Sequence, residues 1–458
     1  MQGGLPRGIR ERRLALALLG SFVALLLGCG ATPTVLPEVV SNPTASFTRQ
    51  AVAAAPTPTW TVAPTVSATP TATATATPPP TPLPPPPGNS PGLSGLGVAA
   101  ADYLTHAGGN VVALEAALAK WGLVSSKQGA VASVSAQAIG PVVVADLSGQ
   151  GSDDVVVAAA DTQAGGTLPE GTLLILHNDG GVYHVVFDSA AAGQTRGPVS
   201  IVSTQDLTGD ARADVTYAIQ SCGASTCFAE LHLLTCRNGE YEDIAGTIAV
   251  AFPDRIEVRE ANGGRELVVH GNTYGSVGAG PQRAQTLIYR VQGGRLTLAE
   301  TSYDASDLLY FKVLDANAAL AAGRLDDAIG LYNQAISDGA LKASAMMMNG
   351  MDAAQEIEAL KSFARFRLVV AYAIRGDEVA ASKAVAEAQS AGGPFAPVAA
   401  AFWGAYSQSK SVDQGCVAVQ ASAEANPDLL GILNAFGYAN PEFAAPDLCR
   451  GAGTAPQP

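Results

Sequence analysis

A ten-residue phrase that occurs twice constrains the fold of this chain more than any other feature. Residues 146–155 read DLSGQGSDDV and residues 206–215 read DLTGDARADV, sixty residues further on. Each phrase follows one Val-rich run and opens another, and a hairpin signal with a Gly-bearing turn comes next, as in GTLLILHNDGGVYHVVFDS. The order strand, Asp loop, strand, hairpin is an internal repeat of β units. A weaker third unit ends near residue 302 and lacks the leading Asp.

The repeated Asp loop has two interpretations, a calcium site or a turn. Ca²⁺ takes six to eight oxygens from a short loop with Asp at alternate positions and Gly where the backbone turns. An Asx-type turn instead uses the Asp oxygens to accept hydrogen bonds from backbone amides. Both interpretations use the same oxygen-bearing residues, which stand at loop positions one, three, five and nine: Asp206, Thr208, Asp210 and Asp214 in one loop, and Asp146, Ser148, Gln150 and Asp154 in the other.

This pattern resembles the FG-GAP or VCBS-type repeat, the blade module of integrin-like β-propellers, whose D-x-D/N-G-D-G-x-x-D loop often binds Ca²⁺ between two strands. The resemblance covers about residues 131–300 and implies a weak Ca²⁺ site. The chain departs from the motif at position three of both loops, at Gln150, and at Ala211, which replaces a Gly. A closed propeller needs four to eight blades, and this stretch suits three. We therefore expect either an incomplete propeller sealed by the preceding helices or another blade-derived sheet.

The first 28 residues have the features of an export signal. A basic segment, RGIRERR, precedes an apolar run of about 15 residues, which is short for a membrane span. The run ends in LLGC, which resembles the bacterial lipobox and implies that Cys29 carries a diacylglycerol and palmitate. Lipid chains at Cys29 would hold the protein on a membrane at the extracytoplasmic cell surface. The alternatives are a secretory signal with an incidental Cys and an N-terminal membrane anchor.

Composition separates the folded part from its flanks. Residues 29–92 are rich in Thr, Pro and Ala, with too few large apolar side chains to offset the entropy of ordering, so we expect a disordered stalk. We expect a disordered tail over 451–458 as well. Charged residues are 14% of the chain and its net charge is −14, which gives no basic surface for nucleic acid.

The folded part is expected to be α+β, with a helical lead-in over 93–124, a β-repeat domain over 125–303 and a helical domain over 304–450. In the lead-in, Val112, Leu114, Leu118 and Trp121 are expected to share one helix face. The helical domain resembles tetratricopeptide repeats, with Gly323, Gly376 and Lys410 at turns and small residues five positions later. Such arrays bind peptides or proteins. A helical cap packed on the β domain is the alternative.

Five cysteines remain after Cys29, as an oxidising compartment allows. Cys222 and Cys227 flank a four-residue hairpin loop, where cross-strand partners can meet the geometry of a disulfide. Cys416 and Cys449 form the other expected pair. Cys236 is then free, or it takes the place of Cys222 or Cys227 in the first disulfide.

No catalytic signature competes with the repeated loop in this sequence, and its five His have no H-x-x-x-H spacing. We therefore expect a non-enzymatic binding or scaffold module for a protein or glycan ligand. A surface hydrolase and a cell-envelope assembly factor that works through the helical repeats are the alternatives.

The lipidation hypothesis predicts that the Cys29→Ser variant incorporates no radiolabelled palmitate and leaves the membrane fraction, because the acylated thiol is gone. Metabolic labelling followed by fractionation measures both. If the Cys29→Ser protein stays on the membrane and the wild type is found unprocessed, the apolar run is an anchor instead.

Overall fold

The computed structural model describes residues 86, 88–123, 138–163, 168–193, 197–344 and 350–450. Within them the chain is α+β, with antiparallel sheets followed by a helical region, as the sequence predicts. The expected export signal with Cys29, the tail over 451–458 and nearly all of the expected stalk lie outside these residues. None of the described helices is long and apolar enough to cross a membrane.

Two helices come first, α1 (Gly92–His106) and α2 (Val111–Trp121). The side chain of Asn110 caps α2 by accepting the Ala113 N–H at 3.0 Å. Leu114, Leu118 and Trp121 are buried, but Val112 is 74% exposed, so the expectation that it shares their face was wrong. At ~100° per residue, Val112 lies nearly opposite Leu114 on the helix.

The β region forms three antiparallel sheets. The first sheet has the order β1 (Val142–Ala145), β2 (Asp154–Ala160), β3 (Gly171–Asp179) and β4 (Val182–Asp188). The second sheet has the order β5 (Val199–Ser203), β6 (Val215–Cys222), β7 (Cys227–Arg237) and β8 (Glu240–Asp243), with β9 (Ile248–Ala251) also paired to β7. The third sheet has the order β10 (Arg255–Ala261), β11 (Gly264–Gly271), β12 (Gln285–Gln292) and β13 (Arg295–Tyr303).

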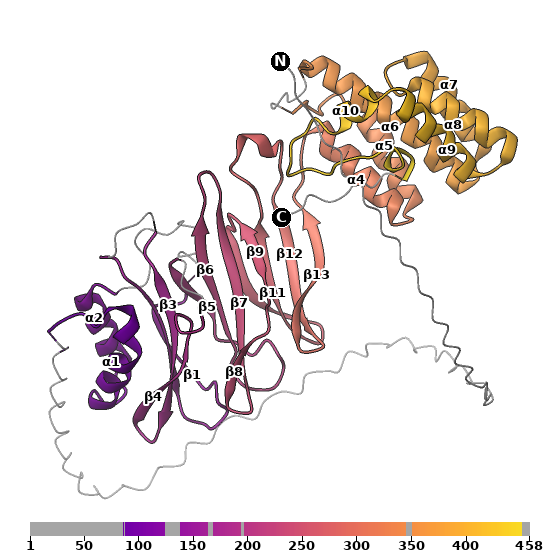
Figure 1. Cartoon of the computed structure of the whole chain (residues 1–458). Helices are drawn as coiled ribbons and strands as arrows, with labels where there is room; N and C mark the ends of the chain where they lie inside the picture. The colour runs from indigo at the N-terminus through magenta and orange to yellow at the C-terminus, as the bar shows by residue number, and fades with distance from the viewer. Residues whose placement is uncertain are drawn as a thin grey trace, which may run out of the picture. The chain divides into compact units, whose positions relative to one another are not determined.

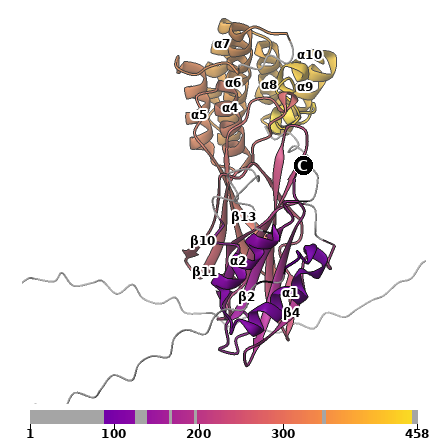
Figure 2. The same cartoon turned by 90° about the vertical axis from the view of Figure 1, so that its left-hand side faces the viewer.

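These sheets stack face to face, and the described sheets do not close into a ring (Figure 1). Strand β2 is buried along its whole length because its side chains alternate between two cores. Val155 and Val157 pack with α1 and α2, while Val156 and Ala158 pack against the second sheet. Figure 2 shows the two helices lying over the outer face of the first sheet. The second sheet packs its other face on the third.

The helical region contains eight described helices. Their bounds are α4 (Leu309–Ala321), α5 (Leu325–Ser337), α6 (Ala353–Arg375), α7 (Glu378–Ala391), α8 (Ala396–Ser409), α9 (Val412–Ala425), α10 (Asp428–Leu433) and α11 (Asp447–Arg450). Short turns join the two helices of each of the pairs α4–α5, α6–α7 and α8–α9. The turns after α4, α6 and α8 each contain a residue with left-handed backbone: Gly323, Gly376 and Lys410. Helices α4 to α9 form three successive antiparallel hairpins that share one core.

Small residues let the paired helices of each hairpin approach closely. Ala328 and Ala381, each five positions after its turn, are fully buried. In the third hairpin the same place holds Gly415, where a Cβ would lie 2.6 Å from the Phe402 ring. The sequence periodicity therefore places these three residues at contacts between helices.

The third sheet and the helical region are joined by long-range polar contacts. The side-chain amide of Asn440 donates to the carbonyls of Ala279 and Pro281, at 3.2 and 3.0 Å. Arg283 forms a two-pronged ion pair with Asp315 of α4. The segment 272–283 contains the 3-10 helix η1 (Val277–Ala279) and packs on residues 436–440.

Two helical glycines give a matched test of this packing. Gly415→Ala should destabilise the protein by about 1–3 kcal/mol, because the new methyl group must displace the buried Phe402 ring. Gly404→Ala in α8 has no atom within 4 Å of the new Cβ. It should stabilise the protein by ~0.5–1 kcal/mol through helix propensity. Urea unfolding of both variants measures the difference, and equal effects would contradict the close approach at Gly415.

Candidate functional site

The two Asp loops connect the first two strands of the first and second sheets. In both loops the leading Asp accepts hydrogen bonds from backbone amides further along the loop. Asp146 accepts from Gly149 at 2.8 Å and from Gly151 at 3.1 Å. Asp206 accepts from Gly209 at 2.7 Å, Asp210 at 3.2 Å and Ala211 at 2.9 Å. Both oxygens of each leading carboxylate are thus engaged.

The last Asp of each loop is buried and holds the start of the loop. Asp154 Oδ2 accepts the N–H groups of Leu147 and Ser148, at 3.2 and 3.1 Å. Asp214 Oδ2 accepts those of Leu207 and Thr208, at 2.7 and 2.8 Å. These equivalent bonds show that the repeated phrase has one conformation in both places.

The other oxygens of these two carboxylates differ. Asp154 Oδ1 lies 2.7 Å from His177 Nδ1. Asp214 has no histidine partner, and the Thr235 hydroxyl is among the groups that favour its ionised form. Burial raises the pKa of Asp214, although the amides of Thr208 and Leu207 favour its ionised form.

Asp210, the expected ligand at position five, is paired with Arg212. The guanidinium donates to Asp210 Oδ2, from Nε at 3.1 Å, and the Arg212 backbone N–H donates to Oδ1 at 3.0 Å. Burial opposes ionisation, but these bonds outweigh it and hold the pKa of Asp210 below its usual value. The Arg212 stem lies over Gly149 of the other loop, where a Cβ would come within 2.8 Å of it.

The remaining expected ligands also take part in the turns. Thr208 Oγ1 lies 3.4 Å from Asp206 Oδ1, and Ser148 Oγ accepts the Gln150 N–H at 3.4 Å. Among the described residues there is no group of three or more His, Cys, Asp or Glu that could hold a metal ion. In this conformation the loop oxygens are engaged as in Asx-type turns.

The leading Asp of each loop also joins its sheet to the next one. The Asp146 carbonyl accepts the N–H of Ala213 from the second loop at 3.2 Å. The Asp206 carbonyl accepts a hydrogen bond from Nη1 of Arg265, in the third sheet, at 3.0 Å. The third unit has a tight turn between Ala261 and Gly264 in place of an Asp loop, and the Arg265 side chain supplies the donor.

Three histidines have aspartate partners that the sequence does not suggest. His177 pairs with Asp154, and His232 pairs with Asp243 at 2.6 Å and stacks on Tyr217. His270 contacts two carboxylates, Asp254 and Asp304. Strand pairing brings these groups together from positions 11 to 34 residues apart, so spacing along the chain gave no signal.

The structure joins the two cysteine pairs that the sequence suggests. Cys222 and Cys227 are directly opposite across β6 and β7, with a Cα–Cα distance of 4.0 Å. Cys416 of α9 is bonded to Cys449 of α11 across 5.4 Å. Cys236 is free and buried in β7.

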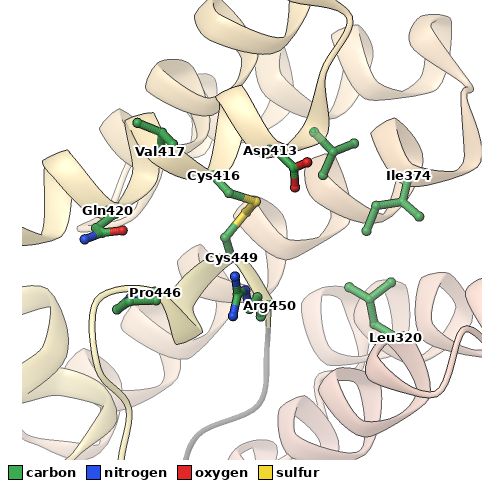
Figure 3. Close-up of a pocket in the computed structure, with 10 residues that line it drawn as sticks. Leu320, Ile374, Asp413, Cys416, Val417, Gln420, Pro446, Cys449 and Arg450 are labelled. Carbon is green, nitrogen blue, oxygen red and sulfur yellow. A yellow bond between two sulfur atoms is a disulfide. The ribbon is translucent and has the colours of Figure 1, made fainter. Parts of the chain in front are cut away.

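The second disulfide forms part of the wall of a cavity of about 540 Å³ in the helical region (Figure 3). Aliphatic side chains from α4, α6 and α9 line it together with two charged ones. Ile374 and Val417 remain 45% and 60% exposed. The lining residues are Leu320, Ile374, Val412, Asp413, Cys416, Val417, Gln420, Pro446, Cys449 and Arg450.

Comparison with protein-family models, with curated proteins and with solved structures finds no match for this chain.

Asp210 and Asp214 of the second loop should differ in their effect on stability. Asp214→Ala should cost about 2–4 kcal/mol, because two backbone amides lose their buried acceptor. Asp210→Ala should cost less than ~1 kcal/mol, because the pair with Arg212 is partly exposed. Chemical unfolding checks both. Equal losses would mean that Asp214 does not hold the loop.

Proposed function

We propose that the protein is a lipoprotein of the bacterial cell surface that acts as a binding or scaffold module. Cys29 anchors it to the membrane, and the Thr/Pro-rich stalk carries the folded part outward. The two disulfides support an oxidising, extracytoplasmic compartment. The stacked sheets serve as a rigid support, and the helical hairpins contact a protein partner.

We propose that the β region is an incomplete propeller made of three FG-GAP-like blades. The repeated Asp loops and the face-to-face sheets support this assignment. Helices α1 and α2 cover the outer face of the first blade. On the third blade, the carboxylate of Glu266 lies between Arg259 and Arg290, at 2.6 and 2.8 Å. Such a charged face does not favour the packing of a fourth blade.

The exposed aliphatic cavity is the observation that carries the proposal of a partner. The three helical hairpins are similar to tetratricopeptide repeats, and such arrays present concave surfaces to proteins. Cavities of about 300–1,000 Å³ with apolar walls and a few polar groups are typical ligand sites. This one has Asp413 and Arg450 among its lining and leaves Ile374 and Val417 open to solvent. A role in cell-envelope assembly rests on the same observation.

Site-specific photo-crosslinking in native membranes tests this proposal. A benzoylphenylalanine at Val417 or at Ile374 should give the same adduct band. The control position is Val379 in α7, which is 85% exposed but does not line the cavity. No adduct at the two cavity positions, or equal adducts at all three, would contradict binding at the cavity.

We also propose that the Asp loops act as turns that join neighbouring blades. In the second loop the Arg212 guanidinium, and not a Ca²⁺ ion, would neutralise the Asp210 carboxylate. Millimolar Ca²⁺ should then change the melting temperature of the wild type by less than ~1 °C. Arg212→Ala frees Asp210, so its melting temperature should rise by about 2–6 °C with Ca²⁺, as for a weak extracellular site.

Differential scanning fluorimetry with Ca²⁺ and with chelator makes this measurement. Arg324→Ala is the control, because Arg324 forms an exposed pair with Asp327 of α5 in the helical region. A rise of several degrees in the wild type would favour the calcium interpretation of the repeated phrase.

A further inference from the structure

His270, near the end of β11, lies between carboxylates from two distant segments. Its Nδ1 is 2.5 Å from Asp254 Oδ1, and its Nε2 is 3.2 Å from both oxygens of Asp304. Asp254 immediately precedes β10, and Asp304 immediately follows β13. The imidazole therefore joins the two edge strands of the third sheet, and it is only 17% exposed.

This arrangement requires a particular protonation state. An imidazolium ring has two N–H donors, whereas a neutral imidazole has one donor and one lone pair. Ionised carboxylates only accept. Both contacts of His270 therefore coexist only while the ring is charged. After deprotonation the shorter contact, to Asp254, retains the N–H, and the Nε2 lone pair then faces Asp304.

Asp304 is the first residue of the connector, residues 304–308, that leads from the third sheet to α4. Its backbone N–H donates to the Ala284 carbonyl at 3.0 Å. The far end of the connector is tied separately, by Asp307 and Lys342 at 2.6 Å. The bond to His270 is thus a side-chain contact that fixes the sheet end of the connector.

We propose that His270 is a proton-controlled latch on this connector, holding Asp304 against the third sheet when charged and releasing it when neutral.

The charges around the ring agree with this assignment. Arg255 on β10 lies opposite His270. The charge of Arg255 is balanced by Glu257, whose Oε1 lies 3.8 Å from Arg255 Nε. On β12 the opposite residue is the uncharged Thr286. On the helical side, Arg283 pairs with Asp315 and Lys342 with Asp307. The two aspartates therefore dominate the field at His270.

The pKa of His270 lies above its usual value of 6.5, chiefly because of the hydrogen bond to Asp254; burial opposes this shift and the bond to Asp304 adds to it. A raised pKa in the folded state means that the latch stabilises fully below pH 6.5. This contribution is lost as the pH rises through the folded-state pKa. The latch is closed in mildly acidic surroundings and open in alkaline ones.

Hydrogen-exchange mass spectrometry of the full-length protein tests the latch. After correction for intrinsic rates, the backbone amides of a peptide that spans the connector should exchange about 3- to 10-fold faster at about pH 8.5 than at about pH 5.5. His270→Gln should give an open connector at both pH values. His106→Gln should keep the wild-type difference, because His106 lies on α1, 3.3 Å from Asp102, far along the chain from the connector.

Asp304→Asn provides a second variant if His270→Gln fails to fold. Its neutral amide cannot form the charged pair, so the connector should be open at both pH values. The latch is wrong if wild-type exchange in the connector changes no more with pH than that of His270→Gln. It is also wrong if Asp304→Asn keeps the wild-type pH dependence.

Discussion

Buried carboxylates that accept backbone amides hold the β region together. Strands that end in a loop leave N–H groups without partners, and such groups are costly when buried. Asp154 and Asp214 each satisfy two of them with one oxygen. This fixes the path of each loop, and the carbonyl of the leading Asp then faces the next sheet. The bonds from Ala213 and Arg265 follow from that placement.

Burial on both faces then sets how the sheets stack. The first sheet packs helices on one side and the second sheet on the other, so its inner strand β2 needs apolar residues at every position after Asp154. The third sheet has an apolar inner face, but its outer face has Glu266 with two arginines. Packing another sheet there would bury the half-exposed guanidinium groups of Arg259 and Arg290, which costs several kcal/mol per ion. The stack accordingly ends at the third sheet.

The helical region depends on close approach and on one buried arginine. Because Gly415 has no side chain, the Phe402 ring can pack directly against its backbone, and the hairpins share a continuous core. Arg367 is fully buried and donates to the carbonyls of Leu448 and Cys449 at the end of α11. Together with the Cys416–Cys449 disulfide, it holds the last helix beside the cavity. The wall of the proposed partner site is thus fixed by contacts 33 to 82 residues apart in the chain.

The sequence by itself determined the elements and their order, because apolar periodicity, turn residues and helix caps act over a few neighbouring residues. It gave the α+β class, the repeated loop and the buried small residues Ala328 and Ala381. It could not decide what the loop oxygens bind, since the same Asp spacing suits a cation and a set of amides. Only the tertiary structure shows that Arg212 lies against Asp210 and over Gly149. It also brought His270 between its two aspartates, because strand pairing depends on the register of whole sheets and not on spacing along the chain.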